Sequence, residues 1–119
     1  MFKWRQLIKS FRYAFKGLRL IFKEEQSFRI QVAAAVGALI LMAVFSLRNW
    51  EKVALILAIS FVLVLELINS IFERLADMMK PRFSFYVEAV KDAMAAAVFL
   101  ASLAAVAIGL IIFLPYFKN

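Results

Sequence analysis

Residues 30–47 read IQVAAAVGALILMAVFSL, a run of eighteen residues that contains no charged side chain. At a rise of about 1.5 Å per residue, a helix of this length nearly spans a hydrocarbon core of about 30 Å. A signal peptide would place its apolar region within roughly the first 15 to 30 residues, whereas 29 residues precede this run. The run therefore predicts a membrane span of the mature protein.

Two further apolar runs follow the first. The second covers about 53–79 and is closed by Lys80 and Pro81, because proline cannot continue a helix. The third covers about 92–114 and is expected to end at Pro115. The chain is therefore predicted to be an all-α membrane protein, a single domain of 119 residues with three transmembrane helices.

The segment before the first span has the pattern of an amphipathic helix. Its basic residues recur at intervals of four, three, four, three and four, which places them on one helical face: Arg5, Lys9, Arg12, Lys16, Arg19 and Lys23. Aromatic and aliphatic residues occupy the other face. A helix over about 3–27 that lies in the membrane interface accounts for both faces. The alternative is an amphipathic helix packed on the core of a soluble domain. A chain with 66% hydrophobic residues is too apolar to form such a domain.

The distribution of charge indicates both a partner and an orientation. Fifteen Lys and Arg residues against eight Asp and Glu residues give +7, which suits nucleic acid or an anionic lipid surface. Because the charges gather at the edges of the apolar runs, we expect membrane lipids and no nucleic acid as partners. Segment 1–29 holds eight basic residues and the expected loop 80–91 holds three, against two in the turn 48–52. The positive-inside rule therefore places the N-terminus on the cytoplasmic side of the cell's inner membrane.

The second span ends in a polar stripe. Its members are spaced by three, four and four residues and fall within about 80° of one another on a helix: Glu66, Asn69, Glu73 and Asp77, with Ser70 beside them. A carboxylate inside the bilayer costs roughly 2.5 to 3.5 kcal/mol on insertion scales, so these groups need partners. Lys91 is one candidate, and a divalent metal such as Mg²⁺, which prefers hard oxygen ligands, is another. Alternatively, the carboxylates pair with basic residues of a neighbouring helix or subunit.

The residue types restrict the chemistry without selecting one reaction. With no cysteine and no histidine, catalysis would depend on carboxylates, lysines and hydroxyls. Such a cluster suits phosphoryl transfer to an alcohol at the membrane surface, and it equally suits a proton or cation pathway. A third hypothesis is that the protein is a non-catalytic adaptor that recruits partners through its basic helix. The chain's three glycines, Gly17, Gly37 and Gly109, are too far apart for a P-loop.

Several stretches resemble one known family. Glu66-Leu-Ile-Asn-Ser-Ile-Phe-Glu73, followed by Asp77 and by Lys91-Asp92-Ala-Met-Ala-Ala-Ala, resembles the signature of the small prokaryotic integral-membrane diacylglycerol and undecaprenol kinases. The segments Tyr13-Ala-Phe-Lys-Gly-Leu-Arg19 and Glu25-Gln-Ser-Phe-Arg29 match the same family. The resemblance implies a homotrimer of three-span subunits, each with an N-terminal surface helix. It also implies transfer of the γ-phosphoryl group of MgATP to a lipid alcohol.

The resemblance assigns roles by position. Glu66 would be the general base, and Glu25 and Glu73 would bind the Mg²⁺ of ATP. The implied nucleotide-binding residues are Tyr13, Asn69, Lys91 and Asp92, and the implied lipid-contacting or supporting residues are Phe28, Arg29, Ser70 and Asp77. The chain departs from the family pattern at Ile71-Phe72, where packing would change, and at 83–86, where nucleotide contacts would change. Either diacylglycerol or undecaprenol fits as the acceptor.

Overall fold

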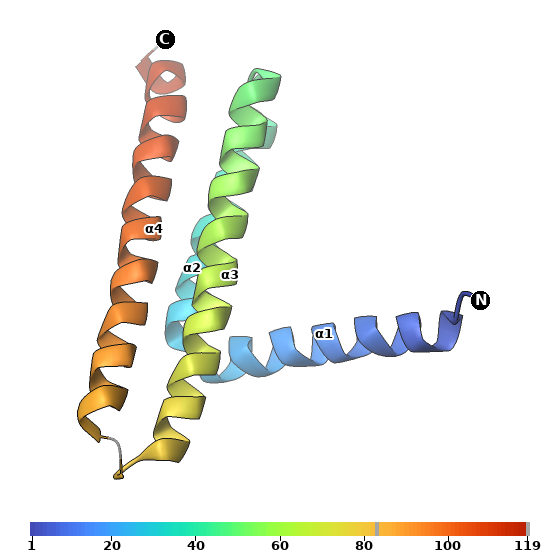
Figure 1. The fold of residues 1–119 in the computed structure, drawn as a ribbon. Helices are drawn as coiled ribbons and strands as arrows, with labels where there is room; N and C mark the ends of the chain where they lie inside the picture. Colours follow the sequence, from blue (N-terminus) through green and yellow to red (C-terminus); the bar gives the residue numbers. More distant parts are fainter. Residues whose placement is uncertain (83, 119) are drawn as a thin grey trace.

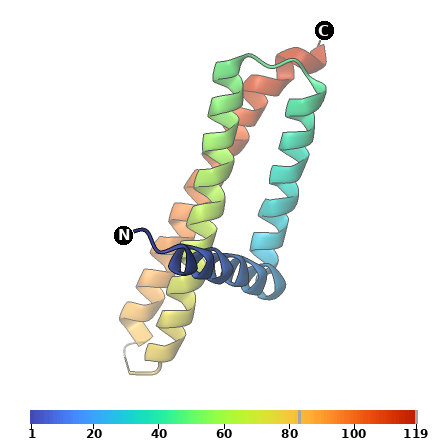
Figure 2. The same cartoon turned by 90° about the vertical axis from the view of Figure 1, so that its right-hand side faces the viewer.

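The computed structural model describes residues 1–82 and 84–118, and these residues form helices and no strand. The helices are α1 (Trp4–Glu24), α2 (Gln26–Val44), α3 (Asn49–Met79) and α4 (Ser84–Lys118). The last three are long and apolar enough to cross a membrane. They run alongside one another, whereas α1 points away from them (Figures 1 and 2). The predicted fold class, three spans after an N-terminal amphipathic helix, is confirmed.

Helix lengths indicate which parts lie inside a bilayer. The 19 residues of α2 are about 28 Å long, close to the hydrocarbon thickness. The 31 residues of α3 and the 35 of α4 reach about 46 Å and about 52 Å. Both longer helices extend past the level at which α1 joins the bundle (Figures 1 and 2). Helix length therefore predicts that the junction of α1 and α2 lies at a membrane boundary, with the extensions of α3 and α4 outside the hydrocarbon core.

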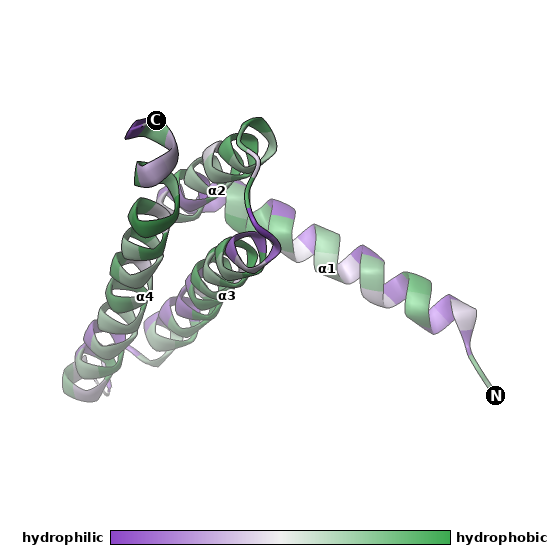
Figure 3. Cartoon of the chain, turned by 90° about the horizontal axis from the view of Figure 1, so that it is seen from above, coloured by the Kyte–Doolittle hydropathy of each residue, from purple (hydrophilic) through white to green (hydrophobic). Residues whose placement is uncertain are grey.

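The surface of α1 has the two faces that its sequence predicts. Hydrophilic and hydrophobic residues alternate along it, whereas α2, α3 and α4 are largely hydrophobic (Figure 3). Ile21 is the α1 residue that the fold buries, and apolar side chains such as Phe11 and Phe15 are at least 60% exposed. Because α1 projects from the bundle at the membrane boundary, its apolar face is available to acyl chains.

Both ends of α4 differ from the prediction. The helix begins at Ser84, so the expected loop 80–91 is wrong, and Lys91 and Asp92 lie on the helix about two turns after its start. Its first turns form because Val87 is buried, only 3% exposed. Phe83, the first residue of the segment 83–86 discussed above, lies outside the described residues.

Pro115 does not end α4, which continues to Lys118. A proline removes one backbone hydrogen bond, and here only three helical residues follow it. The last turn packs on Phe45, whose ring centroid lies 5.6 Å from that of Tyr116 and 5.0 Å from that of Phe117. Aromatic packing across the helices therefore maintains a turn that the sequence alone would interrupt.

The end of the bundle opposite α1 is closed by a small core and a buried carboxylate. Leu47, Leu55, Ile112 and Phe113 form the core. Glu51, in the first turn of α3, is 7% exposed and accepts a hydrogen bond from the Arg48 backbone N–H at 2.9 Å. The Tyr116 hydroxyl donates to the same carboxylate oxygen at 2.6 Å. These bonds join the start of α3 to the end of α4.

Replacing Tyr116 with phenylalanine tests this connection. The variant keeps the ring that packs on Phe45 but removes the donor to Glu51, which leaves a buried carboxylate short of one partner. We expect a lower midpoint of detergent-induced unfolding, followed by circular dichroism. Tyr86→Phe is the matched control, since Tyr86 is 71% exposed. Equal midpoints for the two variants would contradict the connection.

Candidate active site

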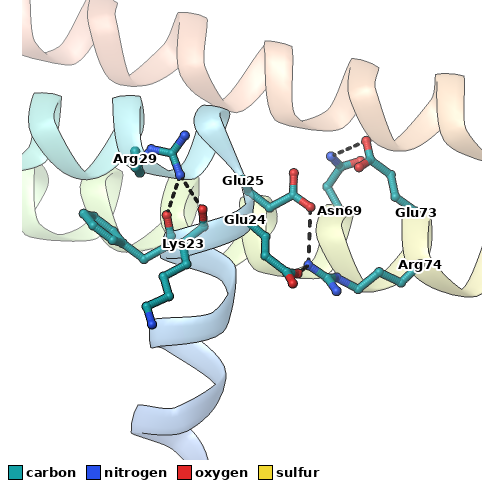
Figure 4. Close-up of polar contacts among 8 residues, drawn as sticks. Lys23, Glu24, Glu25, Arg29, Asn69, Glu73 and Arg74 are labelled. Carbon is teal, nitrogen blue, oxygen red and sulfur yellow. Dashed lines mark hydrogen bonds and ion pairs between the residues drawn. The ribbon is translucent and has the colours of Figure 1, made fainter.

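The junction between α1 and α2 positions the first acidic pair. Glu25 adopts an extended backbone (φ −110°, ψ 111°) between the two helices, so the chain changes direction there. Arg29 stabilises the turn, because its Nη1 donates to the carbonyl oxygens of Phe22 at 2.9 Å and Lys23 at 2.7 Å (Figure 4). These carbonyls belong to the last turn of α1, where helical partners are missing. The turn directs Glu24 and Glu25 toward α3 (Figure 4).

The polar stripe of α3 forms as predicted. Glu66 is 4% exposed and Ser70 is 2% exposed, so both lie inside the bundle. Asn69 and Glu73 are partly buried one turn apart, and Asn69 Nδ2 donates to Glu73 Oε1 at 3.3 Å (Figure 4). Glu66 lies 17 residues after the start of α3, about 26 Å along it, and is therefore near the boundary at which α1 joins. The stripe thus begins in the membrane and continues out of it.

Arg74 connects the junction to the stripe. Its Nη2 contacts Glu24 Oε2 directly and lies 3.6 Å from Glu25 Oε1 (Figure 4). Arg74 was not among the site residues predicted from the sequence. The sequence feature that could have indicated Arg74 is its position directly after Glu73, where it is the only basic residue between 66 and 79. Its partners follow from the direction of the α1–α2 turn, which sequence spacing does not define.

Lys91 connects α4 to the same region. Its Nζ lies 3.1 Å from Asp77 Oδ1, so the predicted pairing of Lys91 with the stripe is confirmed. Nearer the start of α4, Lys80 Nζ lies 2.6 Å from Glu88 Oε1. The predicted acidic and basic clusters on α1, α3 and α4 thus meet at the α1 end of the bundle.

Other predicted residues occupy different surroundings. Phe28 is 4% exposed and belongs to the packing of α2. Asp92 is exposed on α4. Tyr13 is 66% exposed on α1, several turns before the junction. Within one chain, the structure therefore brings together Glu25, Asn69, Glu73 and Arg74, with Glu66 nearby, and leaves Tyr13 outside this cluster.

The electrostatics of the cluster suit a divalent cation. Glu66 experiences repulsion from the carboxylates of both Glu73 and Glu25. Asn69 Oδ1 is buried and accepts no hydrogen bond from the described part of the chain. Carboxylate and amide oxygens are hard ligands, and Mg²⁺ is commonly bound by one or two carboxylates together with substrate phosphates and water. In the described ranges 1–82 and 84–118, no three acidic residues form a complete metal site, so further ligands would come from a phosphate group or water.

An apolar groove leads away from this cluster along the spans. Its volume is about 590 Å³, and it lies between α2, α3 and α4. Gln31, Val62 and Ser102 line it toward the α1 end, and the Gln31 amide donates to the Ser102 hydroxyl at 3.2 Å. Val62 precedes Glu66 by one helical turn, so the groove ends close to the buried carboxyl.

Comparisons with known proteins agree with this arrangement. Residues 12–113 match the prokaryotic diacylglycerol kinase family. The chain is 32% identical over 110 residues to a diacylglycerol kinase of Synechocystis sp., covering 92% of this chain and 63% of that protein. It is 33% identical over 110 residues to the undecaprenol kinase of Bacillus subtilis, covering 92% and 89%.

A third relative is the diacylglycerol kinase of Escherichia coli K12, which is 29% identical over 101 residues, covering 85% of this chain and 83% of that protein. The chain thus spans less than two thirds of the Synechocystis protein but most of the other two. The family match covers the second part of α1, all of α2 and α3, and most of α4. This multi-pass membrane protein therefore belongs to the prokaryotic diacylglycerol kinase family of lipid kinases.

Proposed function

We propose that this protein transfers the γ-phosphoryl group of MgATP to the hydroxyl group of a membrane lipid alcohol. The observation that carries the proposal is the buried Glu66 carboxyl at a membrane boundary, beside Glu25 and Glu73. A lipid hydroxyl and a nucleotide from the aqueous side both reach such a position. The relatives' names, diacylglycerol kinase and undecaprenol kinase, support these two lipids as acceptors.

Glu66 is suited to act as the general base. As the lipid oxygen forms its bond to the γ-phosphorus, the hydroxyl proton moves to the Glu66 carboxylate. The bond between the γ-phosphorus and the β–γ bridging oxygen breaks, and ADP leaves with that oxygen. Glu25 and Glu73 would hold Mg²⁺, which neutralises phosphate charge when bound. Burial of Glu66 excludes bulk water, which favours the lipid oxygen over water as the nucleophile.

Positively charged side chains around the cluster would attract the negatively charged nucleotide. Lys91, which pairs with Asp77, places positive charge on the side where the helices leave the membrane. Asn69 and Asp92 are proposed to contact the nucleotide from α3 and α4. Tyr13 is 66% exposed on α1, a helix that points away from the bundle (Figure 1). The proposed homotrimer would allow Tyr13 to serve the cluster of a neighbouring subunit.

The apolar groove supports a lipid acceptor. Its lining is almost entirely aliphatic or aromatic, and it follows the spans toward Glu66. A hydrocarbon chain lying there would direct its hydroxyl headgroup to the membrane boundary. Phe28, Arg29, Ser70 and Asp77 would support this end of the site, with Arg29 acting through the α1–α2 turn that it stabilises.

The proposed orientation places the cluster in the cytoplasm, where ATP is available. The N-terminal segment contains eight of the fifteen basic residues, and the positive-inside rule assigns it to the cytoplasmic side of the inner membrane. The cation-transporter hypothesis lacks comparable support, because the family match is to lipid kinases.

A labelling experiment tests the function directly. Purified protein is incubated with Mg²⁺, γ-labelled ATP and either diacylglycerol or undecaprenol, and lipid extracts are examined for label. We expect label in at least one phosphorylated lipid and none without Mg²⁺. Label in neither lipid, together with cation flux into proteoliposomes, would support the transporter.

The Glu66→Gln variant tests the general base. It keeps the shape of the side chain but cannot accept the hydroxyl proton, so turnover should fall roughly 10²- to 10⁴-fold. ATP binding, measured with a fluorescent analogue, should change little. Glu88→Gln is the matched control, because Glu88 pairs with Lys80 near the start of α4. Near-normal turnover by Glu66→Gln would refute the assignment.

The Glu25→Ala and Glu73→Ala variants test the metal ligands. Each should raise the Mg²⁺ concentration for half-maximal rate by about tenfold or more, since loss of groups that support a metal site commonly costs this much affinity. The measurement is a Mg²⁺ titration of lipid phosphorylation at fixed ATP. Titration curves that coincide with that of the unmodified protein would argue against a ligand role.

A further inference from the structure

Arg74 interacts unequally with two adjacent carboxylates. Its Nη2 is in direct contact with Glu24 Oε2, but its 3.6 Å separation from Glu25 Oε1 exceeds a hydrogen-bond length (Figure 4). The side chain of Glu24 is 49% exposed, whereas that of Glu25 is 27% exposed. Glu24 is therefore the closer and more exposed partner of the guanidinium, and Glu25 is the more distant and less exposed one.

The junction needs a positive charge in order to stay beside α3. Glu24 and Glu25 lie near two further carboxylates, Glu66 and Glu73, so four negative groups meet in one region. Two buried apolar side chains flank the junction, Ile21 on α1 and Phe28 on α2, and the two junction carboxylates lie between them in sequence. The Arg74 guanidinium spans the gap from α3 to both junction carboxylates. It thereby offsets repulsion that would otherwise move the junction away.

We propose that Arg74 is a positioning residue for the metal site. By pairing with Glu24, it holds the α1–α2 junction against α3 and leaves Glu25 available to share a divalent cation with Glu73. The two adjacent glutamates thus have different tasks, Glu24 as the partner of the arginine and Glu25 as the ligand of the metal. This inference rests on the proposed function for its metal ligands, but it concerns residues to which that function assigns no role.

The proposal distinguishes the effects of losing either partner. Without Arg74, the junction is no longer held beside α3, and Glu25 and Glu73 separate more easily. Without Glu24, Arg74 is free to move onto Glu25 and competes with the metal for its carboxylate. Both substitutions weaken metal binding by removing the same Arg74–Glu24 ion pair. A variant that lacks both residues should therefore bind the metal no more weakly than a variant that lacks Arg74 alone.

The test measures binding of Mn²⁺, as a substitute for Mg²⁺, to the purified protein in lipid nanodiscs by electron paramagnetic resonance. Arg74→Gln and Glu24→Gln should each weaken Mn²⁺ binding about tenfold, as expected for groups that orient metal ligands. The double variant should also be about tenfold weaker, rather than about a hundredfold. Arg74→Lys, which keeps the charge, should recover part of the loss. In lipid phosphorylation, the Mg²⁺ concentration for half-maximal rate should rise by a similar factor of about ten in the single variants.

Arg19→Gln is the matched control, because it removes an arginine from the exposed face of α1 outside the cluster. A Mn²⁺ affinity of Arg74→Gln within about twofold of this control would overturn the proposal, as would additive losses in the double variant. Failure of Mn²⁺ to bind the unmodified protein would also overturn it. Failure of the proposed function would give a different result. The unmodified protein would bind Mn²⁺ and the variants would show the expected affinities, but the unmodified protein would produce no labelled lipid.

Discussion

Glu66 is buried beside two other carboxylates, and a buried negative charge among like charges requires compensation by cations or protons. The arrangement of the α1 end follows from this requirement. Arg74 approaches the junction carboxylates from α3, and Lys91 approaches Asp77 from α4. The remaining repulsion among Glu25, Glu66 and Glu73 favours a divalent cation. The same mutual repulsion of the carboxylates would therefore favour binding of a metal–nucleotide complex.

The two ends of the bundle differ in what holds them together. At the end opposite α1, aromatic packing around Phe45 and the hydrogen bond from Tyr116 to Glu51 join the helices. At the α1 end, charged contacts replace apolar packing, and α1 leaves the bundle altogether (Figure 1). A tightly packed end and a charged end suit a protein that anchors itself in the bilayer and exchanges ligands at one surface.

The different lengths of the helices would keep the binding regions of the two proposed substrates apart. Since α2 matches the hydrocarbon thickness and α3 exceeds it by about 16 Å, one helix carries both a membrane-level carboxyl and residues beyond the membrane. Glu66 lies where an apolar groove ends, and Asp77 lies where the helix has left the bilayer. In the proposed reaction, a lipid hydroxyl and a nucleotide would therefore approach the same helix face from opposite directions.

Much of this architecture is predictable from the sequence because the membrane imposes simple periodic and length constraints. The three spans, the amphipathic α1 and the single face shared by Glu66, Asn69 and Glu73 follow from local spacing. Helix ends are less predictable, since the start of α4 depends on the burial of Val87 and its continuation past Pro115 depends on packing with Phe45.

The role of Arg74 was missed for a related reason. Its partners Glu24 and Glu25 are about 50 residues away in sequence, and they reach it only because the chain turns sharply at Glu25. Local spacing carries no information about that turn. The assignment of Tyr13 stays a prediction, since its side chain is exposed on α1 outside the cluster and would serve a site only through another subunit.

The central claim is that the α1–α2 junction and the stripe of α3 share one metal ion. Paramagnetic broadening by Mn²⁺ in nuclear magnetic resonance spectra of the unmodified protein tests this claim most directly. We expect the backbone amides of Glu25, Asn69 and Glu73 to broaden together at the lowest Mn²⁺ concentrations, while that of Glu51, at the opposite end of the bundle, stays sharp. Broadening of the junction without the stripe, or of the stripe without the junction, would contradict the shared site.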